Sequence, residues 1–467
     1  MMAVMRVLFA TAELSPIATV GGLAAAAAGL GAELRRAGVD LELVMPDYGG
    51  IELDDETRVE LDVPAWVGRA TLRRGDHPDV GGLTLIDVEG MARPHPYLRA
   101  DGTGWPDNES RFFRFSRAVT AAARLSEPDV VHLNDWHTAT ALASLDPAQP
   151  TVLSIHNLAY QGLGDGSWLD VLGPRAEHFE WYGGTNPLSG AIALADRVVA
   201  VSPTYAREIR TAVDGFGLDE PLRQRGPALV GILNGIDTDV WDPRVDPHLP
   251  ETYDDTTLDA KDASRAALHA RFGWPDDRRP LATVVTRLTH QKGIDLLAPL
   301  IPLLDAIPMR LAILGSGDAE LAARLRRAAD GHPDVFAFVE GYDETLSHLM
   351  FAGGDLFVVP SRFEPCGLTQ MQAMRYGTVP VVTAVGGLAD TVPDADDRRD
   401  GLGFVAVRAA PADVFAALVR AARRVSNTRR RRSLQQRMMR LDWSWTEPAR
   451  RYAELYESVL DDRIDAS

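Results

Sequence analysis

Short apolar segments rich in valine, isoleucine and leucine alternate with segments of helical periodicity along most of the chain. Each apolar segment is followed by a turn or by a stretch compatible with a helix, which is typical of a parallel sheet covered by helices on both faces. In the first half of the chain, strands are predicted for RVLFATA, VDLELVMP, DVVHLND, TVLSIHN, RVVAVSP and LVGILNG. The pattern therefore predicts an α/β fold with a doubly wound sheet.

A charged segment with several prolines, residues 241–263, interrupts this alternation and is predicted to be a connector. The alternation then resumes with LATVVTRL, RLAILGSG, VFAFVEGY, LFVVPSR, VPVVTAV and GFVAV. We therefore expect two Rossmann-like domains that face a central cleft, one over residues 1–243 and one over residues 244–441. In residues 442–467, aromatic and apolar residues at helical spacing predict a helix that packs through this stripe.

The composition fits a two-domain protein. The chain has 467 residues, of which 46% are hydrophobic, which is enough to bury two cores. No apolar run reaches the roughly 18 residues of a membrane span, and the N-terminal run is interpreted as a strand rather than a secretory signal. The single cysteine, Cys366, excludes an intramolecular disulfide and agrees with a reducing compartment. We expect a cytoplasmic protein without a membrane partner.

The charged residues narrow the possible partners. A formal net charge of −18 argues against nucleic acid as the main partner, because no electrostatic attraction would drive the association. The one basic run, residues 429–432, is interpreted as a solvated helix face rather than a binding patch. Lys261 and Lys292 are the only lysines among the 48 basic residues of the sequence. Because arginine is used almost everywhere else, a retained lysine points to chemistry that arginine does not supply.

Charged residues follow two predicted strands of the second half, where ligands of parallel sheets bind. Arg287 stands at one strand end, and Lys292 follows beside Gly293, which is expected to begin a helix. Two cations beside a helix N-terminus predict a diphosphate site that needs no metal ion. Glu364 precedes a helix expected to begin near Leu368, and a carboxylate beside free helix N–H groups suits a polyhydroxylated ligand that carries phosphate.

Other strand ends carry weaker signals. Asp135 and His156 follow adjacent predicted strands, but neither an HExxH motif nor a cysteine pair supports a metal site. Tyr342 follows another strand and is interpreted either as a ring that stacks on a nucleotide base or as a buried packing residue. Near the N-terminus, Gly21 and Gly22 stand at a strand-to-helix turn, where backbone N–H groups suit an anionic ligand.

Several longer motifs are specific: SRFEPCGLTQ, YGT followed by GGLADTV, SPTYAREI, LNGID and DWSW. With these motifs the chain resembles, over nearly its whole length, the glycogen and starch synthases, retaining glycosyltransferases of GT-B fold that use a nucleotide-diphosphate glucose donor. The resemblance implies a first domain on the acceptor side, a second that binds the nucleotide sugar, and a C-terminal helix that returns to the first. It implies no cofactor and no metal ion, because the nucleotide-diphospho-sugar is a substrate.

The resemblance also implies roles for single residues. Arg287 and Lys292 match the pair that neutralises the leaving diphosphate in place of a metal ion. Glu364 matches the carboxylate that binds hydroxyls of the donor sugar. His156 matches the histidine near O6 and the anomeric carbon of the sugar, and Asp135 matches the cleft aspartate. The remaining donor-binding positions are Gly21, Gly22, Gly315, Ser316, Tyr342 and the backbone of Cys366, Gly367, Leu368 and Thr369.

Three positions depart from the family pattern. Family members read KxGGLGDV or KxGGLADV where this chain reads TVGGLAAA, so Thr19 stands for the lysine and Ala25 for the aspartate. A second family lysine, in FLKAG, is replaced by Ser189. Losing these charges is expected to change substrate recognition by the first domain, because each is worth a few kcal/mol near a protein surface.

These departures leave more than one function open. In the first hypothesis the protein forms an α-linkage from an ADP- or UDP-glucose donor to a sugar acceptor. In the second it is a pseudo-glycosyltransferase of specialised metabolism, which couples a nucleotide-diphospho-cyclitol to an amino sugar through a C–N bond. In a third it is an inactive sugar-binding protein. The sequence fixes neither the nucleotide base nor the oligomeric state.

Overall fold

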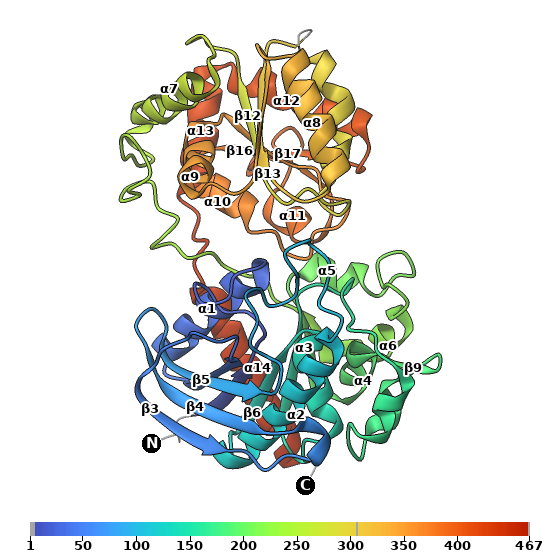
Figure 1. The fold of residues 1–467 in the computed structure, drawn as a ribbon. Helices are drawn as coiled ribbons and strands as arrows, with labels where there is room; N and C mark the ends of the chain where they lie inside the picture. The colour runs from blue at the N-terminus through green and yellow to red at the C-terminus, as the bar shows by residue number, and fades with distance from the viewer. Residues whose placement is uncertain (1–4, 305–306, 466–467) are drawn as a thin grey trace. The chain divides into compact units, whose positions relative to one another are not determined.

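The computed structural model describes residues 5–304 and 307–465. The chain divides into two compact units, which we describe one at a time (Figure 1). The first unit comprises Met1–Gly235 with Trp445–Ser467, and the second unit comprises Ile236–Ser444. The domain limits expected from the sequence stay a prediction. Within the described residues, no helix combines the length and the apolar character needed to cross a membrane.

The first unit is built on a nine-stranded sheet in the order β11-β10-β7-β6-β1-β2-β5-β4-β3. Its parallel part holds β1 (Arg6–Ala10), β2 (Asp40–Pro46), β5 (Gly81–Val88), β6 (Val130–Asn134), β7 (Thr151–Ile155), β10 (Arg197–Ala200) and β11 (Leu229–Gly231). The helices of this unit include α1 (Gly22–Arg36), α2 (Asn108–Ser126), α3 (Trp136–Ala139), α4 (Pro187–Leu194), α5 (Pro203–Glu208) and α6 (Asp219–Gln224). The predicted strands of the first half are therefore confirmed.

Three strands of this sheet were not predicted. They are β3 (Asp54–Glu60), β4 (Ala70–His77) and β5, and both β3 and β4 pair antiparallel with their neighbours. Nearly all residues of β3 are exposed, and β4 alternates buried with less buried positions. Because an edge strand buries little apolar surface, its sequence lacks the apolar run by which central strands are recognised.

The C-terminal helix α14 (Thr446–Asp465) packs on the first unit, as expected (Figure 1). Tyr456 and Tyr452 are buried, and the Tyr456 hydroxyl lies 2.7 Å from Nδ1 of His132 on β6. The other ring nitrogen, Nε2, lies 2.7 Å from the Ser154 hydroxyl on β7. The aromatic stripe predicted from the sequence therefore anchors the helix through hydrogen bonds as well as apolar contact.

The second unit holds a six-stranded, fully parallel sheet in the order β14-β13-β12-β15-β16-β17. These strands are β12 (Leu281–Val285), β13 (Arg310–Gly315), β14 (Phe336–Glu340), β15 (Leu356–Val359), β16 (Val379–Thr383) and β17 (Phe404–Ala406). The helices are α7 (Lys261–Phe272), α8 (Ala319–Gly331), α9 (Glu344–Gly353), α10 (Thr369–Arg375), α11 (Gly386–Thr391), α12 (Pro411–Val425) and α13 (Thr428–Met439). Central strands such as β13 and β16 are fully buried, which explains their continuous apolar runs.

Candidate active site

An ion pair between a lysine and a glutamate lies beyond the carboxyl ends of β12 and β15. The Lys292 ammonium nitrogen is 2.6 Å from Oε2 and 2.9 Å from Oε1 of Glu364. The Ser361 hydroxyl donates a third hydrogen bond, of 2.8 Å, to Oε2. The Glu364 side chain is 7% exposed and that of Lys292 is 20% exposed, so a nearly buried carboxylate is neutralised by a cation that still reaches the surface.

A second ion pair fixes the two loops that carry Lys292 and Glu364. The Arg362 guanidinium makes two hydrogen bonds of 2.7 Å to the Asp295 carboxylate and one of 2.8 Å to the His290 carbonyl oxygen. The hydrogen bonds from Arg362 hold the pKa of the Asp295 carboxyl below its usual value. Because a two-bond arginine–carboxylate pair restricts the geometry of both partners, the loops after β12 and β15 are held together.

Glycine is required at two positions in or beside these loops, because backbone atoms of other segments lie very close to them. Gly293 has φ +64°, and a Cβ at this position would collide with the Pro360 carbonyl oxygen. Gly386 has φ +43° at the start of α11, and a Cβ there would collide with the carbonyl oxygen of Glu364. Only glycine permits both the left-handed backbone and the close approach.

The prediction that a helix begins after Gly293 is wrong. A 3-10 turn, Ile294–Leu296, follows this glycine instead of an α-helix, and a second one spans Ala298–Leu303. Pro299 and Pro302 lie in the next residues. Because proline lacks an N–H and clashes with the preceding helical turn, an α-helix cannot continue here. Lys292 therefore lacks the support of a regular helix N-terminus.

The segment after Glu364 presents free backbone donors. Helix α10 begins at Thr369, close to the expected position, and Gly367 before it has φ +73°. Within the described part of the chain, no acceptor is bound by the backbone N–H groups of Gly367, Leu368 and Thr369. Cys366 is 5% exposed, in agreement with its interpretation as a packing residue. Glu364 thus lies in sequence beside three N–H groups that are available to an anion.

Sequence reasoning missed the support of this segment by Gln370. Its side-chain amide donates to the carbonyl oxygens of Gly367, at 2.8 Å, and Cys366, at 3.3 Å, and to the Thr391 hydroxyl at 3.1 Å. The Gln370 amide oxygen is buried and has no hydrogen-bond partner among the described residues. A glutamine beside the EPCG motif gives no local sign of such contacts.

Arg287, Gly315 and Ser316 lie in neighbouring loops of the second unit. Arg287 is exposed after β12, and in the part of the chain that the structure describes its guanidinium has no hydrogen-bond or ion-pair partner. Gly315 ends β13, and the carbonyl oxygen of Ser316 accepts a 2.7 Å bond from the N–H of Leu288. The adjoining loops after β12 and β13 therefore present an unpaired cation.

Tyr342 follows β14 and is 77% exposed. The alternative of a buried packing tyrosine is therefore wrong. An exposed aromatic ring is free to stack on a planar ligand.

In the first unit, Asp135 and His156 lie together after β6 and β7. The Asp135 carboxylate accepts a 2.7 Å hydrogen bond from the backbone N–H of His156. The backbone of Asp135 has φ +54°. Burial raises the pKa of the Asp135 carboxyl to about 7 and lowers the pKa of the His156 ring to about 4. At neutral pH the histidine is therefore uncharged, whereas the aspartate is partly protonated.

The contact of His156 with Asn134 assigns its tautomer. Nε2 of His156 lies 2.9 Å from Oδ1 of Asn134, and Nδ2 of Asn134 donates to the Ala10 carbonyl oxygen at 3.0 Å. Because an amide oxygen only accepts, Nε2 carries the proton and donates it. Nδ1 is then the unprotonated nitrogen, which is able to accept a hydrogen bond.

The glycine turn differs from a free anion-binding loop. The Glu13 carboxylate accepts hydrogen bonds from the N–H groups of Gly21, at 2.8 Å, and Val20, at 3.0 Å, and from the Tyr97 hydroxyl at 2.9 Å. The N–H of Gly21 is thus already bound to a protein carboxylate, and a donor-binding role for Gly21 and Gly22 stays a prediction. A glutamate eight residues before the glycine gave no sequence signal of this contact.

Burial does not explain the loss of a charged residue at two of the three positions that depart from the family pattern. Thr19 is exposed, and so is Ala25 on α1. Ser189 is buried on α4, where its backbone N–H donates to the Asn186 side chain at 3.1 Å. A charged residue would therefore be tolerated at positions 19 and 25, and packing does not explain its loss.

One group of possible metal ligands lies elsewhere in the second unit. The ligand atoms of Asp246, His248 and His348 lie within 4.8 Å of one another. However, Oδ2 of Asp246 accepts a 2.5 Å bond from the Tyr376 hydroxyl and lies 2.7 Å from Nδ1 of His348. Hydrogen bonding within the unit accounts for this cluster, and it contains no predicted site residue.

Comparison with known proteins decides the family. The model of the starch synthase catalytic domain matches residues 6–224, and that of glycosyl transferases group 1 matches residues 266–436. A glycogen synthase of Rhodopseudomonas palustris (strain BisA53) is 41% identical, over 97% of this chain and 97% of that protein. The chain belongs to the glycogen and starch synthase family. A second glycogen synthase, from Halorhodospira halophila, is 43% identical over 98% of this chain and 100% of its own length.

Two solved structures agree with the fold. The catalytic domain of starch synthase IV from Arabidopsis thaliana, bound to ADP and acarbose, matches with a TM-score of 0.88 and 32% identity, over 98% of this chain and 99% of that chain. A sucrose-phosphate synthase from Thermosynechococcus elongatus, at 19% identity and a TM-score of 0.63, shares the fold alone. The predicted α/β fold of GT-B class and the predicted family are confirmed.

Family membership makes the chain a glycosyltransferase of glycogen synthase type. The three relatives above 30% identity are glycogen and starch synthases, and none of them is named as a pseudo-glycosyltransferase or as an inactive protein. Those two alternatives therefore depend on the three substitutions alone.

Proposed function

We propose that the protein transfers glucose with retention of configuration, without a metal ion, from a nucleotide-diphosphate glucose to the end of an α-glucan. The observation that carries this proposal is the arrangement around Glu364: an ion pair with Lys292 at 2.6 Å and three free N–H groups in the segment that follows. Such a site offers carboxylate oxygens to sugar hydroxyls and positive charge to a diphosphate.

In the proposed reaction, Arg287 and Lys292 stabilise the diphosphate as it leaves. The bond between the anomeric carbon and the phosphate oxygen breaks, and the positive charge that develops on the sugar is balanced by that oxygen. The acceptor hydroxyl attacks from the same face and gives its proton to the phosphate oxygen, so the new C–O bond keeps the configuration. No carboxylate nucleophile is needed, and preorganised cations supply the stabilisation.

We assign His156 to the donor sugar. Its uncharged ring donates through Nε2 to Asn134, which leaves Nδ1 as acceptor for a sugar hydroxyl such as that on C6. Asp135 has a positioning role, because its carboxylate holds the backbone N–H of His156 at 2.7 Å. The exposed ring of Tyr342 is assigned to the nucleotide base.

ADP-glucose is the donor to test first, because the starch synthase IV domain that matches this chain was solved with ADP and acarbose bound. A linear α-glucan is the corresponding acceptor. A UDP-glucose donor remains the alternative in the same assay.

One observation favours a second candidate function. Thr19 and Ala25 are exposed and uncharged where family members carry a lysine and an aspartate, so the first unit has lost charge at positions that would accommodate it. An unsaturated cyclitol also ionises to an allylic cation when diphosphate leaves. Arg287 and Lys292 would then serve the transfer of a cyclitol to an amino sugar, with the amine proton passing to the phosphate oxygen as the C–N bond forms.

A product screen by mass spectrometry distinguishes these functions. ADP-glucose, UDP-glucose and a nucleotide-diphospho-cyclitol are each combined with maltose, glycogen and an amino sugar, and the Lys292→Ala variant serves as the inactive control. Extension of maltose or glycogen supports the first function, and a C–N-linked product alone supports the second. Donor binding by calorimetry without any product would support the inactive sugar-binding protein instead.

A further inference from the structure

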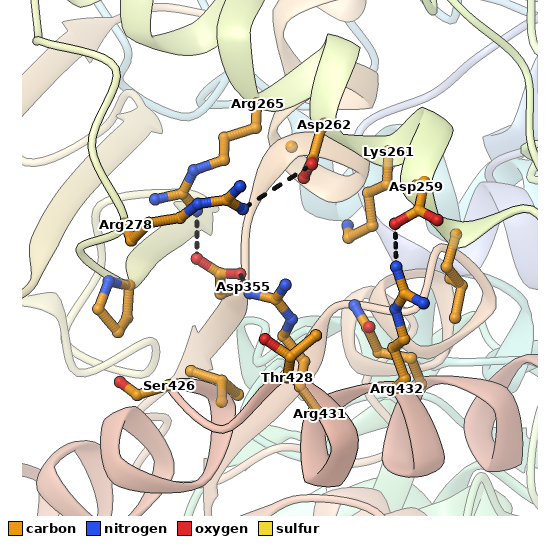
Figure 2. Close-up of a pocket in the computed structure, with 15 residues that line it drawn as sticks. Asp259, Lys261, Asp262, Arg265, Arg278, Asp355, Ser426, Thr428, Arg431 and Arg432 are labelled. Carbon is orange, nitrogen blue, oxygen red and sulfur yellow. Dashed lines mark hydrogen bonds and ion pairs between the residues drawn. The ribbon is translucent and has the colours of Figure 1, made fainter.

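Helix α13 carries arginines toward two different pockets of the second unit. The first pocket, of about 460 Å³, is shown in Figure 2 and lies between α7 and α13. Its cationic residues are Lys261, Arg265, Arg278, Arg431 and Arg432, and the carboxylates of Asp259, Asp262 and Asp355 face them. This pocket therefore contains both members of each ion pair.

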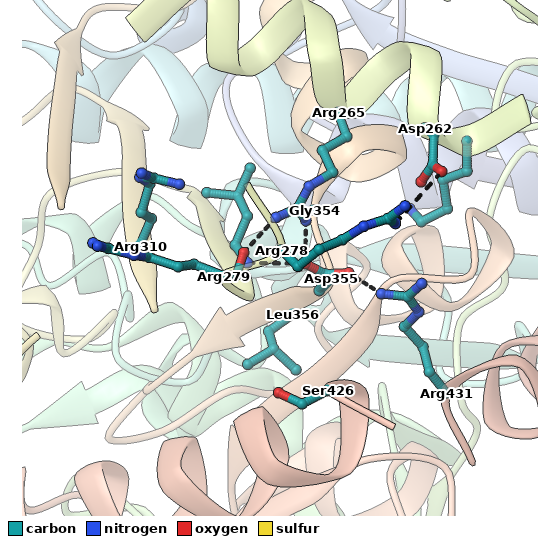
Figure 3. A network of polar contacts seen from close by, with 12 residues as sticks. Asp262, Arg265, Arg278, Arg279, Arg310, Gly354, Asp355, Leu356, Ser426 and Arg431 are labelled. Carbon is teal, nitrogen blue, oxygen red and sulfur yellow. Dashed lines mark hydrogen bonds and ion pairs between the residues drawn. The ribbon is translucent and has the colours of Figure 1, made fainter. Parts of the chain in front are cut away.

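Every cation of the first pocket has a partner. Asp355 binds both Arg265 and Arg431, the latter at 3.2 Å, as Figure 3 shows. Arg432 pairs with Asp259, and Arg278 lies 4.0 Å from Asp262. The Lys261 ammonium is buried and donates to the carbonyl oxygen of Ala352 and, at 2.8 Å, to the hydroxyl of Thr378. These contacts join α7, β15 and α13, so we interpret the first pocket as a structural ion-pair network.

The second pocket has a different composition. It has a volume of about 510 Å³, and among the residues that the structure describes no carboxylate lines it. Six arginines line it: Arg398, Arg399, Arg424, Arg429, Arg430 and Arg437. In a chain of net charge −18, six cations gather around one concavity, and Asp400 and Asp396, which pair with two of them, lie outside its lining.

Half of these arginines are satisfied by the protein. Arg398 binds Asp400 at 2.6 Å, and Arg424 binds Asp396 at 2.8 Å. Arg437 donates to the carbonyl oxygens of Arg399, at 2.7 Å, and Gly401, at 2.8 Å. The last two contacts hold the loop before β17 against α13, so this wall of the pocket is fixed by hydrogen bonds.

The other three arginines of the second pocket lack such partners. Among the residues that the structure describes, the guanidinium groups of Arg399, Arg429 and Arg430 have no ion-pair or hydrogen-bond partner. On the same helix, Arg431 and Arg432 are both paired. Arg429, Arg430 and Arg432 are exposed, in agreement with the interpretation of residues 429–432 as a solvated helix face, whereas Arg431 is partly buried.

We propose that the second pocket binds a small anion that carries two or more linked phosphate groups. Arg399, Arg429 and Arg430 supply unpaired guanidinium groups, whose planar N–H forks match phosphate oxygens. The volume is that of a small-molecule site, and the lining contains no aromatic ring on which a nucleotide base would stack. The ligand is therefore recognised through its phosphates. Lys292 and Glu364 are absent from the lining, so the site is separate from the proposed donor site.

Calorimetric titration of the full chain with tripolyphosphate tests this proposal. Arg429→Ala/Arg430→Ala is expected to weaken binding about tenfold or more, since hydrogen bonds to charged groups are lost. The matched control is Arg432→Ala/Arg440→Ala, which removes the same charge from the same helix region at surface pairs with Asp259 and Asp255. The control is expected to stay within about twofold of the wild type.

Further titrations test whether the anion binds at this pocket and binds there specifically. Lys292→Ala is expected to retain the tripolyphosphate site, whereas loss of all binding in this variant would place the anion at the donor site and overturn the proposal. Equal weakening in both double variants would show unspecific attraction, and no binding to the wild type at millimolar tripolyphosphate would also overturn it. A single-stranded oligonucleotide that binds more tightly than tripolyphosphate, and depends on Arg429 and Arg430, would reassign the pocket to nucleic acid. Arg429→Gln/Arg430→Gln repeats the test if the alanine variant melts at a lower temperature.

Discussion

The ammonium of Lys292 lies 2.6 Å from one oxygen of the Glu364 carboxylate and 2.9 Å from the other, and the carboxylate is nearly buried. The two residues thus neutralise each other. In the proposed function, the hydroxyls of a bound diphospho-sugar and the oxygens of its diphosphate offer each of them a new partner. The ion pair is therefore expected to contribute both to the stability of the fold and to catalysis, and mutations can separate these two contributions.

Lys292→Ala is expected to lower kcat by about 100-fold or more, because a preorganised charge on the leaving group is lost. It is also expected to destabilise the protein by about 1–3 kcal/mol, because Glu364 keeps a nearly buried charge without its counter-ion. Initial rates with ADP-glucose and the melting temperature check the two effects.

The control is the double variant Lys292→Ala/Glu364→Gln. Removing the unpaired charge should restore much of the melting temperature, whereas activity should stay low. A double variant that recovers both would show that Lys292 acts on stability alone.

Arg287→Ala is expected to act on the donor alone. The guanidinium is exposed and has no partner among the described residues, so the melting temperature should change little, by the equivalent of about 0.5 kcal/mol or less. Loss of a charge-assisted contact to phosphate should weaken ADP binding about tenfold. Titration calorimetry measures this change. Arg326→Ala serves as the charge-matched control, because Arg326 lies on α8 and forms a surface ion pair with Glu340. Equal ADP affinity in wild type and Arg287→Ala would remove Arg287 from the donor site.

The central strands and the ends that carry Asp135, Lys292 and Glu364 could be predicted from the sequence, because buried parallel strands are continuous apolar runs. The exposed edge strand β3 could not, because it lacks such a run. The contacts of Glu13 with Gly21 and of Gln370 with Thr391 were also missed. Such contacts depend on how turns bring side chains together, and neither partner belongs to a local pattern that indicates them.

Thr19→Lys tests whether the altered glycine turn sets the choice of substrate. Residue 19 is exposed, so the variant should fold with an unchanged melting temperature. If the lost charge limits the use of ADP-glucose, kcat/KM for glucan extension should rise about fivefold to tenfold, as expected for one added charge near a phosphate at the surface. Thr19→Gln, which adds length without charge, is the control. An unchanged kcat/KM in Thr19→Lys would show that this position does not govern the donor.

The pKa of Asp135 predicts a pH-dependent stability. Burial raises it to about 7 from a usual value near 4, so the folded protein binds a proton that the unfolded chain has released in this range. The stabilisation from the protonated carboxyl is present below about pH 4 and is lost as the pH rises through 7. Asp135→Asn keeps an acceptor for the His156 N–H and does not ionise, so its stability relative to the wild type should increase from pH 4 to pH 7.5, by at most about 4 kcal/mol.

Urea unfolding of both proteins at pH 5 and pH 7.5 checks this prediction. Comparing the two proteins at each pH cancels the contribution of His156, whose lowered pKa of about 4 makes the fold less stable as the pH falls from 6.5. A difference between Asp135→Asn and wild type that is the same at both pH values would show that Asp135 ionises in the folded protein as readily as in the unfolded chain. In that case the carboxylate would be fully charged at neutral pH, and its contact with the His156 N–H would be a charge-assisted hydrogen bond throughout the working range.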